Sequence, residues 1–123
     1  MAGRQRADGI GLDLLEIERI ERALARRPGL AHRLFHPGEL EYAGSRARPA
    51  QHLAARFCAK EAVSKALAMA VFAPLDVEVL GGGAEVGLAL HGAARERAEE
   101  LGVEVGVSLT HTGGMAGAVA VLW

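Results

Sequence analysis

The segment Ala55-Arg-Phe-Cys-Ala-Lys-Glu-Ala-Val-Ser-Lys-Ala-Leu67 decides the fold, because it predicts a long helix with one small apolar side and one charged side. Pro49 favours a helix start, since the first helical position does not need the N–H that proline lacks. We expect the helix to run to about Ala70, before Pro74 stops it. Its alanine-rich side would let another element approach closely.

The charged side of this predicted helix groups side chains that suit phosphate groups. At about 100° per residue, three of them form one stripe and two lie beside it: Arg56, Lys60 and Ser64, then Glu61 and Lys65. Two interpretations are open. The side is either a solvated surface with a Glu61–Lys65 pair at i,i+4, worth a few tenths of a kcal/mol, or a binding site.

A second segment, Gly9-Ile-Gly-Leu-Asp-Leu-Leu-Glu-Ile17, alternates aliphatic residues with glycine and one acid, which predicts a strand. One face of the strand is aliphatic. The other carries bare glycine before Asp13, and we expect open space beside that carboxylate. A helix should follow from about Glu16 and end at Pro28-Gly29. Asp13 is either an edge-strand or helix-capping residue at the strand-to-helix junction, or it belongs to a site.

Asp13 and Glu61 are acids inside mostly apolar elements, where an ionised carboxylate is costly unless something neutralises it. A divalent metal ion shared by the two carboxylates would do so. The Arg and Lys residues near Glu61 would suit phosphate. The sequence therefore predicts one site formed by two segments that are far apart in the chain.

The remaining segments predict an α+β domain. We expect short helical turns around His36-Pro37-Gly38, a loop over 44–48 and a helix over 93–101. The predicted strands cover 76–80, 85–90, 103–110 and 115–122, with His111-Thr-Gly-Gly as the last turn. We interpret the glycine run at 81–83 as a hairpin turn, because no Lys-Ser/Thr follows it as in a phosphate-binding loop.

Composition and charge exclude several classes of protein. At 123 residues the chain fits one domain, residues 1–123, with a modest core. A net charge of −1 argues against non-specific nucleic-acid binding. No apolar run reaches the ~20 residues of a membrane helix. One cysteine, and no apolar leader in residues 1–8, favour a reducing, cytoplasmic location.

Three blocks of the sequence, taken together, are specific enough to indicate one protein family. They are Gly9-Ile-Gly-Leu-Asp-Leu-Leu-Glu-Ile-Glu-Arg-Ile20, Arg56-Phe-Cys-Ala-Lys-Glu-Ala-Val-Ser-Lys-Ala66, and Val107-Ser-Leu-Thr-His-Thr112 followed by Ala118-Val-Ala-Val121. In this order and at these separations, the chain resembles holo-acyl-carrier-protein synthase, the small bacterial class of 4′-phosphopantetheinyl transferase.

The resemblance implies a small antiparallel sheet packed against a long central helix, in a homotrimer with active sites between subunits. Members of the family transfer the 4′-phosphopantetheine arm of coenzyme A to a serine hydroxyl of an apo acyl carrier protein and release adenosine 3′,5′-bisphosphate. Asp13 and Glu61 would hold Mg²⁺, an ion that prefers carboxylate, phosphate and water oxygens. The serine proton would pass to Asp13 or to a metal-linked water.

Other site residues follow from the same resemblance. The implied coenzyme contacts are Arg56, Lys60, Ser64, Lys65, His111 and Thr112, and Lys65 would act near the pyrophosphate during the reaction. Arg19, Arg22 and Arg26 would form a positive helix side for the acidic helix of a carrier protein, where charge complementarity sets encounter rate and specificity. Carriers of fatty-acid, polyketide and peptide synthesis all stay open as partners.

The segment Gly81-Gly-Gly-Ala-Glu85 departs from the family pattern, which usually has a Gly-Lys-Pro-like sequence there. Lysine and proline are absent, and Glu85 adds a negative charge. An alternative is therefore a non-catalytic module of the same fold that binds coenzyme A or a carrier protein. This alternative predicts binding without release of adenosine 3′,5′-bisphosphate.

Overall fold

The computed structural model describes residues 8–123 of the chain. Residues 1–7, which form most of the segment where no leader is expected, lie outside the described part. The helices are α1 (Ile17–Arg26), α2 (Leu30–Leu34), α3 (Pro37–Gly44), α4 (Pro49–Ala66) and α5 (Gly92–Leu101), with a 3₁₀ turn over Pro74–Asp76. The strands are β1 (Gly9–Glu16), β2 (Val77–Gly82), β3 (Glu85–Leu90), β4 (Val105–Thr112) and β5 (Met115–Leu122). The predicted α+β class is confirmed.

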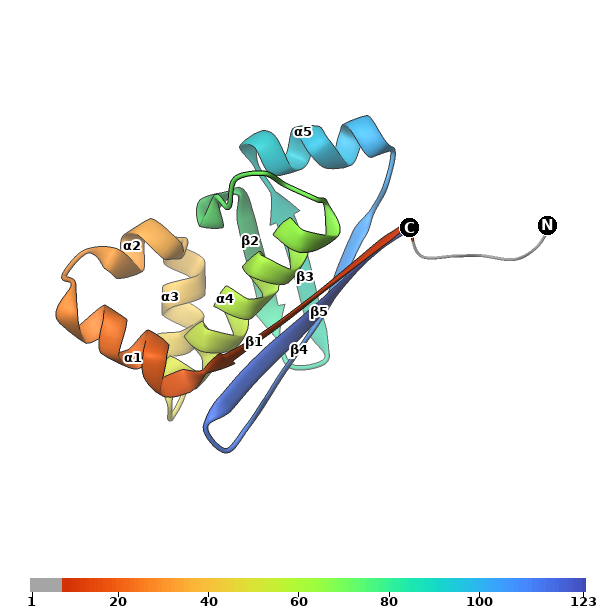
Figure 1. Ribbon diagram of the computed structural model, residues 1–123. Coiled ribbons are helices and arrows are strands. Elements are labelled where there is room, and N and C mark those ends of the chain that lie inside the picture. Colours follow the sequence, from red (N-terminus) through yellow and green to blue (C-terminus); the bar gives the residue numbers. More distant parts are fainter. Residues whose placement is uncertain (1–7) are drawn as a thin grey trace.

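The strands form two antiparallel sheets, and α4 packs against both of them (Figure 1). β5 lies between β1 and β4 in the three-stranded sheet, whereas β2 and β3 form a separate hairpin. Helices α1, α2 and α3 gather at one end of α4, and α5 lies toward the other end (Figure 1). Among residues 8–123, no helix is both long and apolar enough to cross a membrane.

The last hairpin turns more tightly than the sequence suggests. His111 and Thr112 pair with the start of β5 as the end of β4, so the prediction that they belong to the turn is wrong. Only Gly113 and Gly114 connect the two strands. Gly113 has a φ of +55°, which a residue without Cβ adopts readily.

Strand β1 turns its glycine face toward α4. A Cβ atom on Gly11 would lie 2.0 Å from the carbonyl oxygen of Ala62, so only glycine allows this approach. The expectation of open space on this face is therefore wrong at Gly11, because helix backbone fills it. Ile10, Leu12 and Leu14 lie on the opposite face, with 68%, 60% and 64% of their surface exposed.

The core is built from small side chains on α4. Ala54, Ala59 and Ala62 have no exposed surface, and they belong to one cluster with aliphatic residues of β2 and β5. Protein interiors are densely packed, so short side chains bring the backbones of helix and strand close together. Residues of α4 and β1 are therefore held at a short and rigid separation.

Helix α4 ends at Ala66, one turn before the expected end at Ala70. Ala68 has a φ of +53°, in the left-handed region that a continuing helix cannot use. The carbonyl of Leu67 accepts a hydrogen bond from Arg97 Nε at 3.0 Å. This contact from α5 satisfies one of the carbonyls that every helix end leaves free.

Candidate functional site

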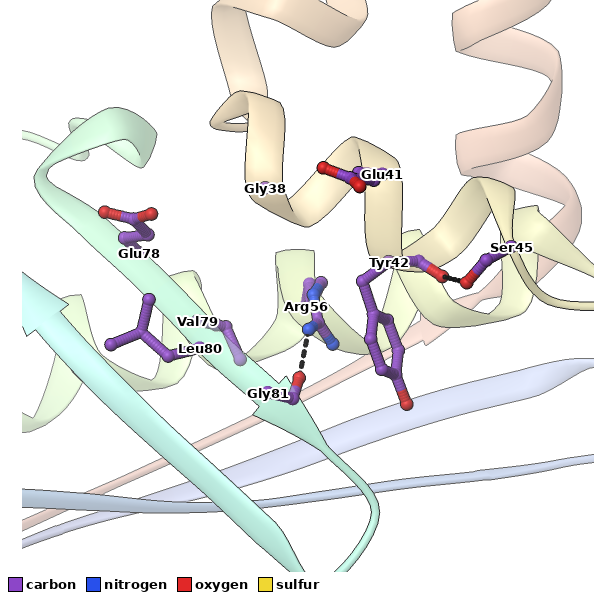
Figure 2. Close-up of a pocket in the computed structure, with 9 residues that line it drawn as sticks. All are labelled: Gly38, Glu41, Tyr42, Ser45, Arg56, Glu78, Val79, Leu80 and Gly81. Carbon is purple, nitrogen blue, oxygen red and sulfur yellow. Dashed lines mark hydrogen bonds between the residues drawn. The ribbon is translucent and has the colours of Figure 1, made fainter.

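Arg56 of α4 lines a cavity of about 360 Å³ between α3 and β2 (Figure 2). Only 3% of the residue is exposed. Its guanidinium lies 4.0 Å from the ring centre of Tyr42 and donates to the carbonyl of Gly81. Its Nε is buried without a hydrogen-bond partner among the described residues, and burial lowers the pKa of Arg56. The guanidinium therefore brings a positive charge to the wall of this cavity, which would suit an anion.

A second cavity of about 300 Å³ shares Tyr42 and Arg56 with the first. His52 of α4 and His111 of β4 also line it, and their ring centres are 5.6 Å apart in an edge-on arrangement. Burial, and then the positive charges of His111, Arg46 and Arg56, lower the pKa of His52. The structure therefore brings together Arg56 and His111, which were predicted to bind one ligand.

Sequence reasoning missed Tyr42 and His52 as parts of this site. His52 precedes Arg56 by four residues, which places both on one helix face, so helical spacing was an available signal. Tyr42 lies on a separate helix, and only the tertiary structure brings its ring against Arg56. A Cβ atom on Gly82 would lie 2.0 Å from the Tyr42 hydroxyl oxygen, so this glycine lets the β2–β3 hairpin approach the tyrosine.

Asp13 lies in the middle of β1, paired with Ala118 of β5. The N-cap of α1 is Glu16, with no side-chain cap, so the interpretation of Asp13 as a helix cap is wrong. Its interpretation as an edge-strand residue is confirmed, because β1 is at the edge of the three-stranded sheet. Asp13 Oδ1 accepts a hydrogen bond from Lys65 Nζ at 3.1 Å, and the same ammonium donates to the Leu12 carbonyl at 2.9 Å. The carboxylate of β1 is thereby tied directly to α4.

Glu61 lies close enough to Asp13 for the two charges to interact. Burial, and then the charge of Asp13, raise the pKa of Glu61, while Lys65 acts in the opposite direction. Two carboxylates that repel each other favour either a proton or a cation between them. The two predicted metal ligands and Lys65 are therefore brought into one place.

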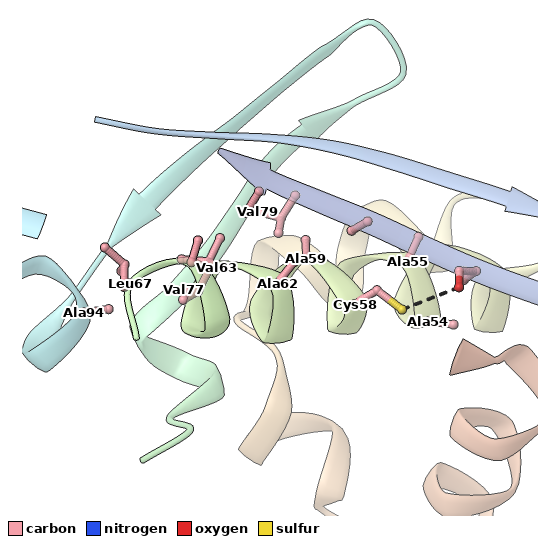
Figure 3. Close-up of a cluster of buried hydrophobic side chains, with 14 of the residues drawn as sticks. Ala54, Ala55, Cys58, Ala59, Ala62, Val63, Leu67, Val77, Val79 and Ala94 are labelled. Atoms are coloured by element: carbon pink, nitrogen blue, oxygen red, sulfur yellow. Dashed lines mark hydrogen bonds between the residues drawn. The ribbon is translucent and has the colours of Figure 1, made fainter. Parts of the chain in front are cut away.

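Cys58 lies on the buried side of α4 near the same carboxylates. Its Sγ donates to the Ala116 carbonyl at 3.7 Å, as the dashed line in Figure 3 shows. Burial, and then the charge and hydrogen bonding of Asp13, raise the pKa of the Cys58 thiol to about 12. A thiol with this pKa stays protonated at neutral pH, so Cys58 packs the core and is no nucleophile.

Lys60 lies in the interior and not on a solvated stripe. Neither Lys60 nor its partner Glu39 has exposed side-chain surface. Lys60 Nζ donates to Glu39 Oε1 at 2.8 Å and to the carbonyls of Pro74 and Val77 at 3.0 and 2.5 Å. Glu39 Oε2 accepts from the Val79 N–H at 3.0 Å. The pair therefore holds β2 and α3 on α4, and Lys60 has no free surface for a coenzyme.

The other predicted contacts are more dispersed. Ser64 lines a different, small cavity with Met69 and Asp76. Thr112 is exposed at the end of β4, and Thr110 of the same strand lines the cavity next to His111. Neither Ser64 nor Thr112 therefore lines the two cavities that contain Arg56.

Arg19, Arg22 and Arg26 are all exposed on α1. Arg22 pairs with Glu18 at 2.5 Å, but both side chains are more than half exposed. A pair of this kind contributes about 0–1 kcal/mol because water screens it. The three cations are therefore available to an acidic partner.

The sequence matches the family model of the 4′-phosphopantetheinyl transferase superfamily over residues 9–111. The chain belongs to this superfamily. It is 46% identical, over 118 residues and 91% of each chain, to a holo-[acyl-carrier-protein] synthase of Moorella thermoacetica. It is also 46% identical, over 116 residues, to one of Streptomyces coelicolor, covering 92% of this chain and 94% of the relative.

The fold of this phosphopantetheinyl transferase superfamily member agrees with a solved relative. The crystal structure of Helicobacter pylori holo-[acyl-carrier-protein] synthase in complex with coenzyme A matches with a TM-score of 0.78 at 26% identity. The match covers 93% of this chain and 99% of that chain. The family resemblance inferred from three sequence blocks is confirmed.

Proposed function

We propose that this chain transfers the 4′-phosphopantetheine arm of coenzyme A to a serine hydroxyl of an apo acyl carrier protein and releases adenosine 3′,5′-bisphosphate. The observation that carries the proposal is the Asp13 carboxylate of β1 held 3.1 Å from Lys65 Nζ, on the helix that also carries Glu61. The names of relatives at 46% identity support it, as does the structural match to a synthase that binds coenzyme A.

The carboxylates of Asp13 and Glu61 fit Mg²⁺. This ion takes hard oxygen ligands, usually one or two carboxylates together with phosphate and water oxygens. Burial and the Asp13 charge raise the pKa of Glu61, which is the repulsion that a cation relieves. When bound, Mg²⁺ would neutralise the charge that develops on the phosphate oxygens and the leaving group.

We assign the coenzyme to the two cavities that share Arg56. Arg56 lines both cavities, so its guanidinium supports a phosphate contact. We keep His111 at the 3′-phosphate end, and Thr112, which lines neither cavity, lies one residue beyond it on β4. Lys65 is half exposed, so its ammonium is free to leave the Leu12 carbonyl and contact the pyrophosphate. Lys60 then lies behind the site and positions β2 and α3 on α4.

Asp13 is our candidate for the group that accepts the serine proton. Its side chain is 18% exposed, so a hydroxyl can reach it from solvent. The carboxylate accepts from Lys65, which holds it in one orientation. A water beside the carboxylate pair is the alternative acceptor.

The carrier protein is assigned to the arginine side of α1, formed by Arg19, Arg22 and Arg26. These side chains are exposed, and α1 follows directly on the strand that carries Asp13. A carrier helix with acidic residues would be steered to this side by charge complementarity.

We propose a homotrimer with active sites between subunits. The outward face of the three-stranded sheet is apolar, with Ile10, Leu12 and Leu14 at least 60% exposed. A hollow of about 150 Å³ on this face is lined by Leu12, Leu14 and Val119. Exposed apolar patches of this kind mark association sites. Light scattering should give a trimer for the native chain and a smaller species for Leu12→Lys.

The proposed reaction is tested by incubating the protein with coenzyme A, Mg²⁺ and an apo acyl carrier protein, and reading the carrier by intact mass. We expect a gain of one phosphopantetheine arm that is lost with a chelator. Asp13→Ala and Glu61→Ala should abolish the gain, whereas Glu100→Ala, an exposed acid on α5, should keep it. Full activity in either of the first two variants would refute the metal assignment.

The segment Gly81–Glu85 favours a second candidate function, a non-catalytic module that binds coenzyme A or a carrier. Gly81 and Gly82 belong to β2 and not to the predicted turn, and Gly83 and Ala84 connect β2 to β3. The segment carries no lysine and has an exposed acid at Glu85. Binding of coenzyme A without mass gain on fatty-acid, polyketide and peptide carriers would support this candidate. In that case the transferase proposal fails.

A further inference from the structure

Beside the cavity assigned to the coenzyme, which Glu78 also lines, three side chains from different elements meet at one point. His36 precedes α3, Glu78 lies on β2 and His91 precedes α5. One ligand atom from each lies within 4.8 Å of the others. Two imidazoles and one carboxylate are a donor set that suits divalent transition metals.

The distances in this cluster suit a metal ion. His91 Nε2 donates a hydrogen bond to Glu78 Oε1 at 3.0 Å, a contact that a bound ion would replace, and Glu78 Oε1 is 3.9 Å from His36 Nδ1. In a tetrahedral shell with bonds of about 2.0 Å, neighbouring ligand atoms are about 3.3 Å apart. The two observed separations lie on either side of this value.

The His36 ring is already oriented as a ligand. Its Nε2 is 2.7 Å from the carbonyl oxygen of Leu75. Because a carbonyl only accepts, Nε2 carries the proton, and Nδ1 of the neutral ring is the acceptor nitrogen on the side of Glu78. Histidines that bind metals usually donate their second ring N–H to a carbonyl or carboxylate in this way.

The backbone beneath the ligands is fixed by contacts that do not involve a metal. The Lys60–Glu39 pair holds β2 at the residues on both sides of Glu78. The His91 N–H donates to the Asp76 carbonyl at 2.8 Å, and the Asp76 carboxylate accepts from the first turn of α5. Such preorganisation lowers the cost of ordering the ligands around an ion.

The geometry points to a second metal site, formed by His36, Glu78 and His91, that takes one divalent transition ion such as Zn²⁺ and leaves one position to solvent. Mg²⁺ is not the expected ion, because it prefers oxygen ligands. The His91 and Glu78 side chains are 46% and 22% exposed, so an ion can enter. A bound ion would join the starts of α3 and α5 to β2 and stabilise the fold.

The test uses the full chain with Asp13→Ala, so that the carboxylate pair does not compete for the ion. Zn²⁺ is titrated into the metal-free protein by calorimetry, and visible absorption of Co²⁺ reports the ligand geometry. His91→Ala and Glu78→Gln are compared with His52→Ala. This control removes one imidazole from the pair His52 and His111, which lies elsewhere in the molecule. Circular dichroism confirms that each variant is folded before titration.

We expect one Zn²⁺ per chain, an affinity at least about tenfold weaker with His91→Ala or Glu78→Gln, and no change with His52→Ala. Zn²⁺ should also raise the Tm of the His52→Ala protein and not that of the His91→Ala protein. Absence of Zn²⁺ binding, equal affinity in these two variants, or displacement of Zn²⁺ by millimolar Mg²⁺ would overturn the proposal. None of these outcomes depends on the transferase activity.

Discussion

Lys60 and Lys65 lie on the same helix, and each pairs with an acid from a distant segment, but their surroundings differ. The Lys60–Glu39 pair has no exposed side-chain surface, and its ammonium also donates to two backbone carbonyls. The Lys65–Asp13 pair has side chains that are 53% and 18% exposed. One pair is part of the interior, and the other lies at the surface.

Because of this difference, the Lys60–Glu39 pair stabilises the fold, whereas the Lys65–Asp13 pair is free to bind a ligand. Removing one partner of a buried ion pair leaves an uncompensated charge, which is strongly destabilising. An exposed pair contributes little, so its side chains can exchange partners at small cost. Lys65 can therefore contact a ligand, whereas Lys60 cannot leave Glu39.

The largest expected effect comes from Lys60→Met. The change leaves the Glu39 carboxylate buried without its cation and should lower the free energy of unfolding by about 3–5 kcal/mol. Urea unfolding followed by circular dichroism measures it. Adding Glu39→Gln removes the stranded charge and should recover part of the loss. A change below about 1 kcal/mol for Lys60→Met would show that the pair is not a stabilising contact.

Lys65→Met should change the free energy of unfolding little and the rate of phosphopantetheine transfer strongly. Because the pair is exposed, the free energy of unfolding should fall by no more than about 1 kcal/mol. Phosphopantetheine transfer should fall by about 100-fold, since a cation that stabilises developing charge is lost. Initial rates from intact mass of the carrier, together with urea unfolding, separate the two effects. Unchanged rates would remove Lys65 from the proposed mechanism.

Gly11→Ala tests the contact that places Asp13 beside Lys65. The new Cβ would lie 2.0 Å from the Ala62 carbonyl oxygen, so β1 must move away from α4. We expect a loss of about 1–3 kcal/mol in the free energy of unfolding and weaker binding of Mg²⁺. Gly44→Ala is the matched control, because no atom lies near its Cβ position. Equal stability of the two variants would contradict the close approach.

The smallest effect concerns pH. Burial and the Asp13 charge raise the pKa of Glu61 above its ordinary 4.5. The unfolded chain has the ordinary pKa of 4.5 at Glu61, and the folded chain has a higher one. At a pH between the two, the folded state binds more protons than the unfolded state, so the contribution of Glu61 to the free energy of unfolding falls as pH rises. Asp13→Asn removes one cause and should lower the pKa of Glu61. Carbon-detected NMR of the Glu61 carboxyl in metal-free protein measures the shift, and an unchanged pKa would mean that the carboxylates do not interact.

The sequence predicted the elements that carry the site better than it predicted their surroundings. The strand around Asp13, the helix from Pro49 and the final strand from Met115 all occur as expected. The packing of the glycine face of β1 against α4 and the burial of Lys60 were not anticipated, since each depends on which segment lies against it. Tyr42 and Glu39 were missed for the same reason, because their partners on α4 and β2 are distant in sequence.

By itself, the sequence determined the α+β class, the family and the two acids on β1 and α4. These features follow from periodicity and from motifs within short segments. Only the tertiary structure decided which charge on α4 is buried, that the glycine face of β1 meets the helix, and that His36, Glu78 and His91 meet. The physical reason is that burial and side-chain contacts depend on segments that are far apart in the chain and are brought together only by packing.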